Sequence, residues 1–180
     1  VNEFSYQLFK TKEPRELYNA YNISTDRIQK KKLQEGIFVI LNILEYGIND
    51  KYEKSLDYAE NYMKEKKQNE KQNPLEAEQN FLAMKNTFSE FNKFIVRLCT
   101  KVRFPFSKEL YGISSRNYKF QISIAMIVAG IFKEKLFEKQ VLQEILKNDK
   151  KLDAFMDKIK EELLNSFLEN SEYNASSTNS

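Results

Sequence analysis

The sequence predicts an all-α fold, a single-domain bundle of about six to eight helices, and three observations support this. From Phe81 to Val102 the apolar side chains recur at alternating steps of three and four residues, the spacing of a helix with one apolar face. The chain has only four Gly and three Pro, and a β-rich fold needs more turn-forming residues. A length of 180 residues suits one domain with one core, which we expect to cover residues 1–170.

The N-terminal part should hold an arm and two helices. Residues 1–12 contain aromatic side chains without a sustained helical period, so we expect an arm that packs against the bundle. Pro14 suits the first turn of a short helix that runs to about Asn22. Ser24 is a suitable cap for a second helix, which should end near Gly47 because glycine readily terminates helices.

A third and a fourth helix should follow. The third begins near Asp50, and its apolar stripe consists of Tyr52, Leu56, Ala59 and Met63. It should fray into residues 64–72, an exposed linker with no apolar side chain to bury. Asn73 and Pro74 form a suitable cap and first turn for the long fourth helix, which Pro105 prevents from continuing.

The most apolar stretch, residues 122–132, is expected to be the central helix of the bundle. Before it, residues 107–111 form a short turn that stops at Gly112, and Ser114 or Ser115 caps the central helix. The stretch is too short to span a bilayer, which needs about 20 apolar residues. We therefore expect it to be buried among the other helices.

Two further helices, about residues 134–147 and 149–169, complete the predicted bundle. The second carries four acids at steps of four residues, namely Asp149, Asp153, Asp157 and Glu161. Carboxylates on one face can bind a divalent cation, but lysines surround these and no second group of ligands is evident. We therefore expect a solvated face, no metal and no cofactor. The small polar residues 171–180 should form a disordered tail.

Missing residue types argue against several kinds of active site. The chain has no His and a single Cys, so it has no imidazole base, no Ser–His or Cys–His pair and no His-ligated zinc. Cys99 has no second cysteine to pair with and adjoins the apolar stripe, as a small buried hydrophobe would. No P-loop, GxGxxG, GxSxG or HExxH motif occurs. We do not expect an enzyme.

Basic side chains gather between residues 93 and 119. Because the net charge is only +3, the case for an anionic partner rests on such local clustering. The segment turns around Pro105, so its arginines can converge on phosphate, sulfate or carboxylate groups, and Tyr111 and Tyr118 could stack on bases. The candidate anion-contact patch consists of Arg97, Lys101, Arg103, Arg116 and Lys119. The alternative is an ordinary solvated face whose partner acids come from other helices.

Residues 15–28, RELYNAYNISTDRI, predict a short Tyr-bearing helix, a break and a capped helix that enters the core. This pattern resembles the opening of the helical domains of outer-surface lipoproteins from Lyme-disease spirochaetes. It covers about the first third of the chain, and the Lys- and Asn-rich helices with few Pro, His, Trp or Cys follow the same habit. The resemblance implies a lipid-anchored domain on a flexible tether at the outer cell surface, with the anchor upstream of Val1 as the only membrane contact.

Some relatives in that group bind host complement regulators, plasminogen or tick ligands, so the resemblance implies a host or vector protein as the partner. The expected function is therefore that of a non-enzymatic, surface-exposed lipoprotein ectodomain. The alternative is a cytoplasmic nucleic-acid-binding or regulatory domain that uses the same basic patch. A purely structural or assembly subunit is a third option, and the oligomeric state stays open.

Overall fold

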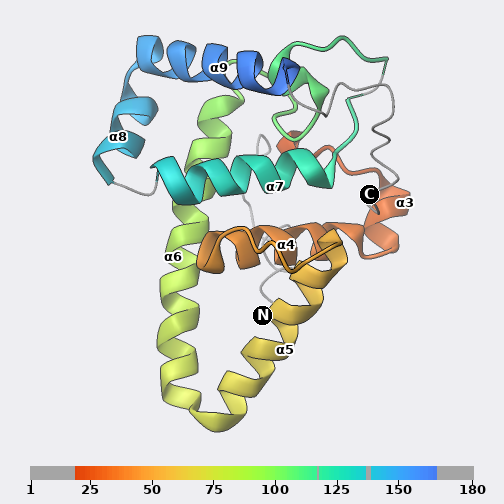
Figure 1. Cartoon of the computed structure of the whole chain (residues 1–180), viewed down its shortest axis with the longest axis vertical. Coiled ribbons are helices and arrows are strands. Elements are labelled where there is room, and N and C mark those ends of the chain that lie inside the picture. The colour runs from red at the N-terminus through yellow and green to blue at the C-terminus, as the bar shows by residue number, and fades with distance from the viewer. Residues whose placement is uncertain (1–18, 117, 137–138, 166–180) are drawn as a thin grey trace.

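The computed structural model describes residues 19–116, 118–136 and 139–165, and these residues form helices and no strand (Figure 1). The α-helices are α3 (Thr25–Gln29), α4 (Lys32–Tyr46), α5 (Ser55–Gln72), α6 (Pro74–Leu98), α7 (Ile122–Ile131), α8 (Lys139–Lys147) and α9 (Asp149–Leu164). The chain also forms a 3-10 turn, η1 (Lys108–Tyr111), and a π-helical turn, η2 (Phe132–Leu136), and residues 19–21 are helical. The prediction of an all-α helical bundle is confirmed. The predicted arm, the start of the helix at Pro14 and the tail lie outside the described residues.

The helix predicted from Ser24 to Gly47 is divided in two. Lys31, between α3 and α4, has a left-handed backbone with φ of 58°, and the Ser24 side chain makes no cap hydrogen bond. The break redirects α3 so that the Arg27 guanidinium donates a hydrogen bond of 3.1 Å to the Phe120 carbonyl. Gly47 ends α4 as predicted, with φ of 82°.

The central apolar helix is α4 rather than α7. Every residue from 36 to 44 is buried, and α4 packs against α5, α6 and α7. The side-chain amide nitrogen of the buried Asn42 donates a hydrogen bond of 3.0 Å to the Tyr58 carbonyl, so this polar group is satisfied. Four apolar side chains of α7 are only half-buried: Ile122, Met126, Ile127 and Ile131. The strongest apolar run in the sequence therefore lies at the side of the core.

Helix α5 continues where a linker was predicted. Residues 64–72 are helical because Lys, Glu and Gln favour helix, and because Lys66 finds partners on α4. The buried stripe also differs in part from the prediction. Ala59 is buried as predicted, but Tyr58 and Tyr62 are buried beside it, whereas Leu56 and Met63 are exposed.

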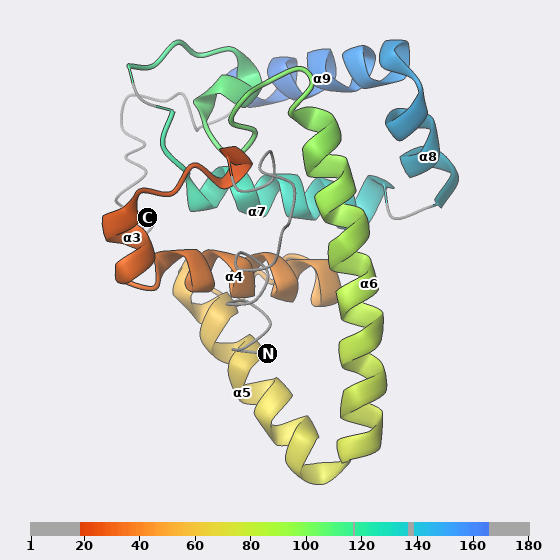
Figure 2. The ribbon, with the colours of Figure 1, turned by 180° about the vertical axis from the view of Figure 1, so that it is seen from behind.

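Helices α5 and α6 form a hairpin that projects from the body of the bundle (Figures 1 and 2). The Asn73 side chain accepts a hydrogen bond from the Glu76 amide and Pro74 lies in the first turn of α6, as predicted. The core stripe is confirmed for Met84, Phe88, Phe91, Ile95 and Leu98. The helix stops at Leu98, short of Pro105. The amides of Thr100 and Lys101 donate to the carbonyls of Arg97 and Leu98, and these hydrogen bonds form a turn at the end of the helix.

The described residues between Gly112 and α7 are not helical. Neither Ser114 nor Ser115 caps α7, which begins after Gln121. The Gln121 amide donates a hydrogen bond of 2.9 Å to the Phe106 carbonyl, and this tie keeps the segment beside the loop that follows α6. The predicted turn at residues 107–111 is confirmed as η1. It ends at Gly112, where φ is 81°.

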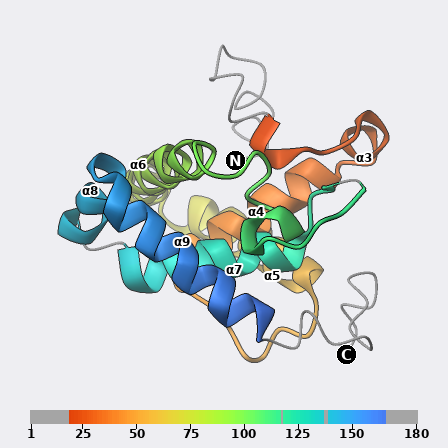
Figure 3. The ribbon, with the colours of Figure 1, turned by 90° about the horizontal axis from the view of Figure 1, so that it is seen from above.

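The C-terminal helices close one end of the bundle. In the view from above, α9 crosses over α7, with α8 connecting it to the side on which α6 lies (Figure 3). Asn148 caps α9 by accepting hydrogen bonds from the amides of Lys150 and Lys151. The predicted end of this helix at residue 169 lies outside the described residues.

Candidate functional site

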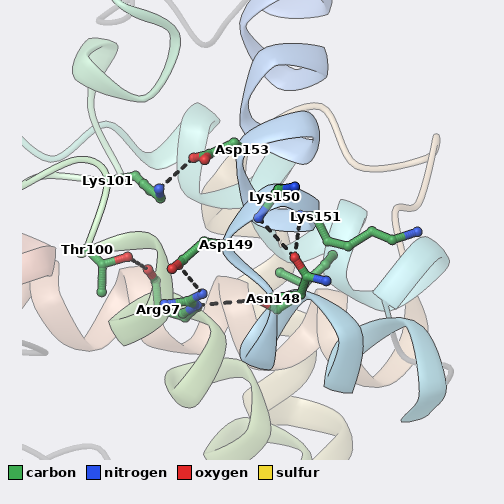
Figure 4. A network of polar contacts seen from close by, with 9 residues as sticks. Arg97, Thr100, Lys101, Asn148, Asp149, Lys150, Lys151 and Asp153 are labelled. Atoms are coloured by element: carbon green, nitrogen blue, oxygen red, sulfur yellow. Dashed lines mark hydrogen bonds and ion pairs between the residues drawn. The ribbon is translucent and has the colours of Figure 1, made fainter.

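Two of the predicted patch residues are neutralised by acids of α9. The Arg97 guanidinium, in the last turn of α6, lies 2.6 Å from the Asp149 carboxylate and donates a hydrogen bond of 3.4 Å to the Ile145 carbonyl (Figure 4). The Lys101 ammonium lies 2.6 Å from the Asp153 carboxylate. The Arg97 side chain is only 20% exposed. Both cations therefore attach α9 to the end of α6, which is a structural role.

The spacing of two of the acids on α9 thus has a structural explanation. Asp149 and Asp153 stand four residues apart, as do Arg97 and Lys101, so each acid meets one of these cations. For these two positions the partner acids come from another helix, as the alternative interpretation of the patch expected. Among the described residues no group of three His, Cys, Asp or Glu could hold a metal ion.

The other three patch residues lie on two neighbouring segments. Arg103, Arg116 and Lys119 are exposed, and none has an acidic partner within 4 Å among the described residues. The Phe104 and Tyr118 rings, 6.1 Å apart between centroids, join the two segments, and the Arg103 guanidinium lies 5.0 Å from the Phe104 ring. We call Arg103, Phe104, Arg116, Tyr118 and Lys119 the loop face.

Hydrogen bonds to backbone carbonyls hold the part of the loop face that contains Tyr118 and Lys119. The Asn22 side-chain amide donates to the Tyr118 carbonyl, and the Arg27 guanidinium donates to the Phe120 carbonyl. The Gln121 amide also donates to the Phe106 carbonyl, so the three hydrogen bonds together hold residues 118–121 in place. Arg27 was missed from the sequence because its acceptor lies 93 residues away and no local pattern signals such a contact.

The aromatic side chains of the patch do not form an open stacking platform. Tyr111 is buried, so the prediction that it stacks on bases is wrong. Tyr118 is half-buried against Phe104, whose ring also contacts Arg103. The loop face therefore offers charge and guanidinium donors more than free ring faces.

Sequence reasoning also missed a polar cluster between α4 and α5. Lys66 pairs with the Glu45 carboxylate, and its ammonium lies 5.4 Å and 5.1 Å from the ring centroids of Tyr46 and Tyr62. Burial, reinforced by Glu45, raises the pKa of both tyrosines above their usual value. The Lys133 ammonium donates to the Glu45 carbonyl at 3.2 Å. This cluster joins α4, α5 and η2, and its polar groups contact one another.

A cavity of about 350 Å³ lies between α5 and α6 near the tip of the hairpin. Its lining includes Lys66, Glu70, Glu78 and Phe81. Charges of both signs alternate there with apolar side chains, a composition that favours no single class of ligand.

Comparison of the chain with protein-family models, with curated proteins and with solved structures finds no match. None of the helices in the described ranges combines the length and the apolar content needed to cross a bilayer. The loop face is therefore the candidate functional site.

Proposed function

We propose that the chain is a non-enzymatic ectodomain of a surface-exposed lipoprotein and that it binds a host or vector macromolecule through the loop face. One observation carries the binding part of this proposal. Where Arg97 and Lys101 are matched by acids of α9, Arg103, Arg116 and Lys119 stay without an acidic partner among the described residues. Unmatched cations on connecting segments favour recognition of an acidic ligand surface.

Part of the loop face is held in place before a ligand binds, which favours binding. The segment that carries Tyr118 and Lys119 is tied by hydrogen bonds from the side chains of Asn22 and Arg27 to its carbonyls and by a backbone hydrogen bond to Phe106, so less conformational entropy is lost when a ligand binds. A guanidinium presents a planar fork of donors to carboxylate, sulfate or phosphate groups. Binding by charge at such a face is sensitive to salt and needs no catalytic group.

The alternative, a cytoplasmic nucleic-acid-binding domain, would use the same cations. It would depend on phosphate contacts more than on base stacking, because Tyr111 is buried and Tyr118 packs on Phe104. Its signature is an affinity for DNA or RNA whose logarithm falls linearly with the logarithm of the salt concentration.

Protease shaving of intact source cells tests the location, with an antibody to this domain and a known cytoplasmic protein as the control. Loss of the domain while the control survives supports surface display. Protection until the cells are lysed contradicts it and favours the nucleic-acid alternative. Charge reversal on the loop face, by Arg103→Glu with Arg116→Glu, tests the binding surface separately.

A further inference from the structure

Helix α6 has a second stripe on the side opposite its core stripe. Steps of four, three, four and three residues connect Leu75, Gln79, Leu82, Asn86 and Ser89, all of which are exposed. At 3.6 residues per turn these positions form one face, turned away from Met84, Phe88 and Phe91. Leu75 and Leu82 are 75% and 54% exposed, the largest values among the exposed large hydrophobic side chains of the described residues. We call this stripe the outer face of α6.

The position of the outer face leaves it accessible. The N-terminal half of α6 extends beyond α4, and α5 lies along its inner side (Figures 1 and 2). No described part of the chain covers Leu75 or Leu82. Two exposed leucines two turns apart on an uncharged helix face are typical of a helix that packs against another helix.

Charges beside the outer face make it complementary to itself. Glu78 and Lys85 lie on the same flank of α6, two turns apart, and neither forms an ion pair among the described residues. Between Leu75 and Ser89 the stripe itself contains no charged residue. A two-fold axis perpendicular to α6 would exchange the ends of this flank, so each acid would approach a lysine.

We propose that the outer face of α6 binds the same face of a second copy of this chain, with the two helices antiparallel. Leu82 then packs beside Leu82 of the partner subunit at the two-fold axis, and Leu75 lies beside the partner subunit's Ser89. In the same register Glu78 approaches the partner subunit's Lys85, and the last two contacts are repeated by symmetry. In a parallel pair the two copies of this flank would lie on opposite sides of the interface, so Glu78 would not meet Lys85. A parallel pair would also bring the two copies of α8 together, because α8 packs beside the C-terminal half of α6 (Figure 1).

The contact is small, so the association should be weak and visible only at high protein concentration. Sedimentation velocity from low micromolar to about 1 mM protein is therefore the appropriate measurement. The expected result is a mass that rises with concentration toward twice that of the single chain. The variant Leu75→Glu with Leu82→Glu should stay monomeric over the whole range. The matched control, Leu56→Glu with Met63→Glu, alters two exposed apolar residues of α5 and should still dimerise.

A charge cycle tests the antiparallel orientation. Glu78→Lys alone and Lys85→Glu alone should each weaken dimerisation by about threefold to tenfold, and the variant that carries both changes should restore it. Circular dichroism confirms that each variant keeps its helices. A wild-type chain that stays monomeric up to about 1 mM overturns the proposal, as does equal loss of dimer in the α5 control. Failure of the double reversal to restore the dimer overturns the antiparallel pairing.

Discussion

Replacing Arg97 with alanine should destabilise the fold without removing the anion-binding surface. The side chain is 20% exposed, and it bonds both the Asp149 carboxylate and the Ile145 carbonyl. A hydrogen bond to a charged group contributes about 1.5–3 kcal/mol, and an exposed ion pair about 0.2–1 kcal/mol. Because Asp149 is 73% exposed and the bond to Ile145 is long, we expect a loss of about 1–1.5 kcal/mol in the free energy of unfolding.

Urea denaturation of Arg97→Ala, Asp149→Asn and the double variant measures this contribution. The double-mutant cycle should give a coupling of about 0.5–1 kcal/mol between the two side chains. Retention of Arg97→Ala on a heparin column should change less than that of Arg103→Ala. A coupling of zero would refute the structural role of the pair. Stronger loss of heparin retention for Arg97→Ala than for Arg103→Ala would refute its exclusion from the binding surface.

Three further predictions concern the core, a polar cluster and a helix cap. Phe91→Ala should cost about 3–5 kcal/mol by urea denaturation, since this ring is fully buried against other aromatic rings; a cost below about 1 kcal/mol would contradict that packing. The raised pKa of Tyr62 means that the folded chain keeps a proton that the unfolded chain releases above about pH 10, so stability should fall as the pH rises beyond that value. Tyr62→Phe should make this alkaline loss smaller, and an unchanged pH profile would count against the cluster. Asn148→Ala removes the cap of α9 and should lower stability by about 1 kcal/mol in the same assay, with Lys147→Ala as the neighbouring control.

Local signals in the sequence predicted the elements whose causes are local. Asn73 and Pro74 begin α6, and Gly47 and Gly112 end their helices with positive φ, because capping and turn chemistry act within a few residues. The core stripe of α6 was predicted for the same reason, since helical periodicity is visible in a single segment.

Contacts between distant segments account for what the sequence did not predict. The break at Lys31 accompanies the hydrogen bond from Arg27 to the distant Phe120 carbonyl. The composition of residues 64–72 predicted a linker, because the sequence does not reveal that Lys66 pairs with Glu45 on another helix. Such contacts override local propensity and leave no periodic pattern.

The candidate site shows the same difference between local signals and contacts between distant segments. Charge density along the chain placed all five patch residues together, but charge density does not reveal which cations meet an acid. The structure pairs Arg97 with Asp149 and Lys101 with Asp153, residues about 50 positions apart in the sequence. Of the five, Arg103, Arg116 and Lys119 have no acidic partner in the described part of the chain and stay available to a ligand.

The most direct test of the loop face compares two charge-reversed variants on a heparin column developed with a salt gradient. One carries Arg103→Glu with Arg116→Glu, and the control carries Lys150→Glu with Lys158→Glu on the exposed side of α9. Both variants change the net charge by the same amount, so any difference reports on position. We predict that the loop-face variant elutes at clearly lower salt than the control. Equal elution of the two variants would contradict the assignment of the loop face as the binding surface.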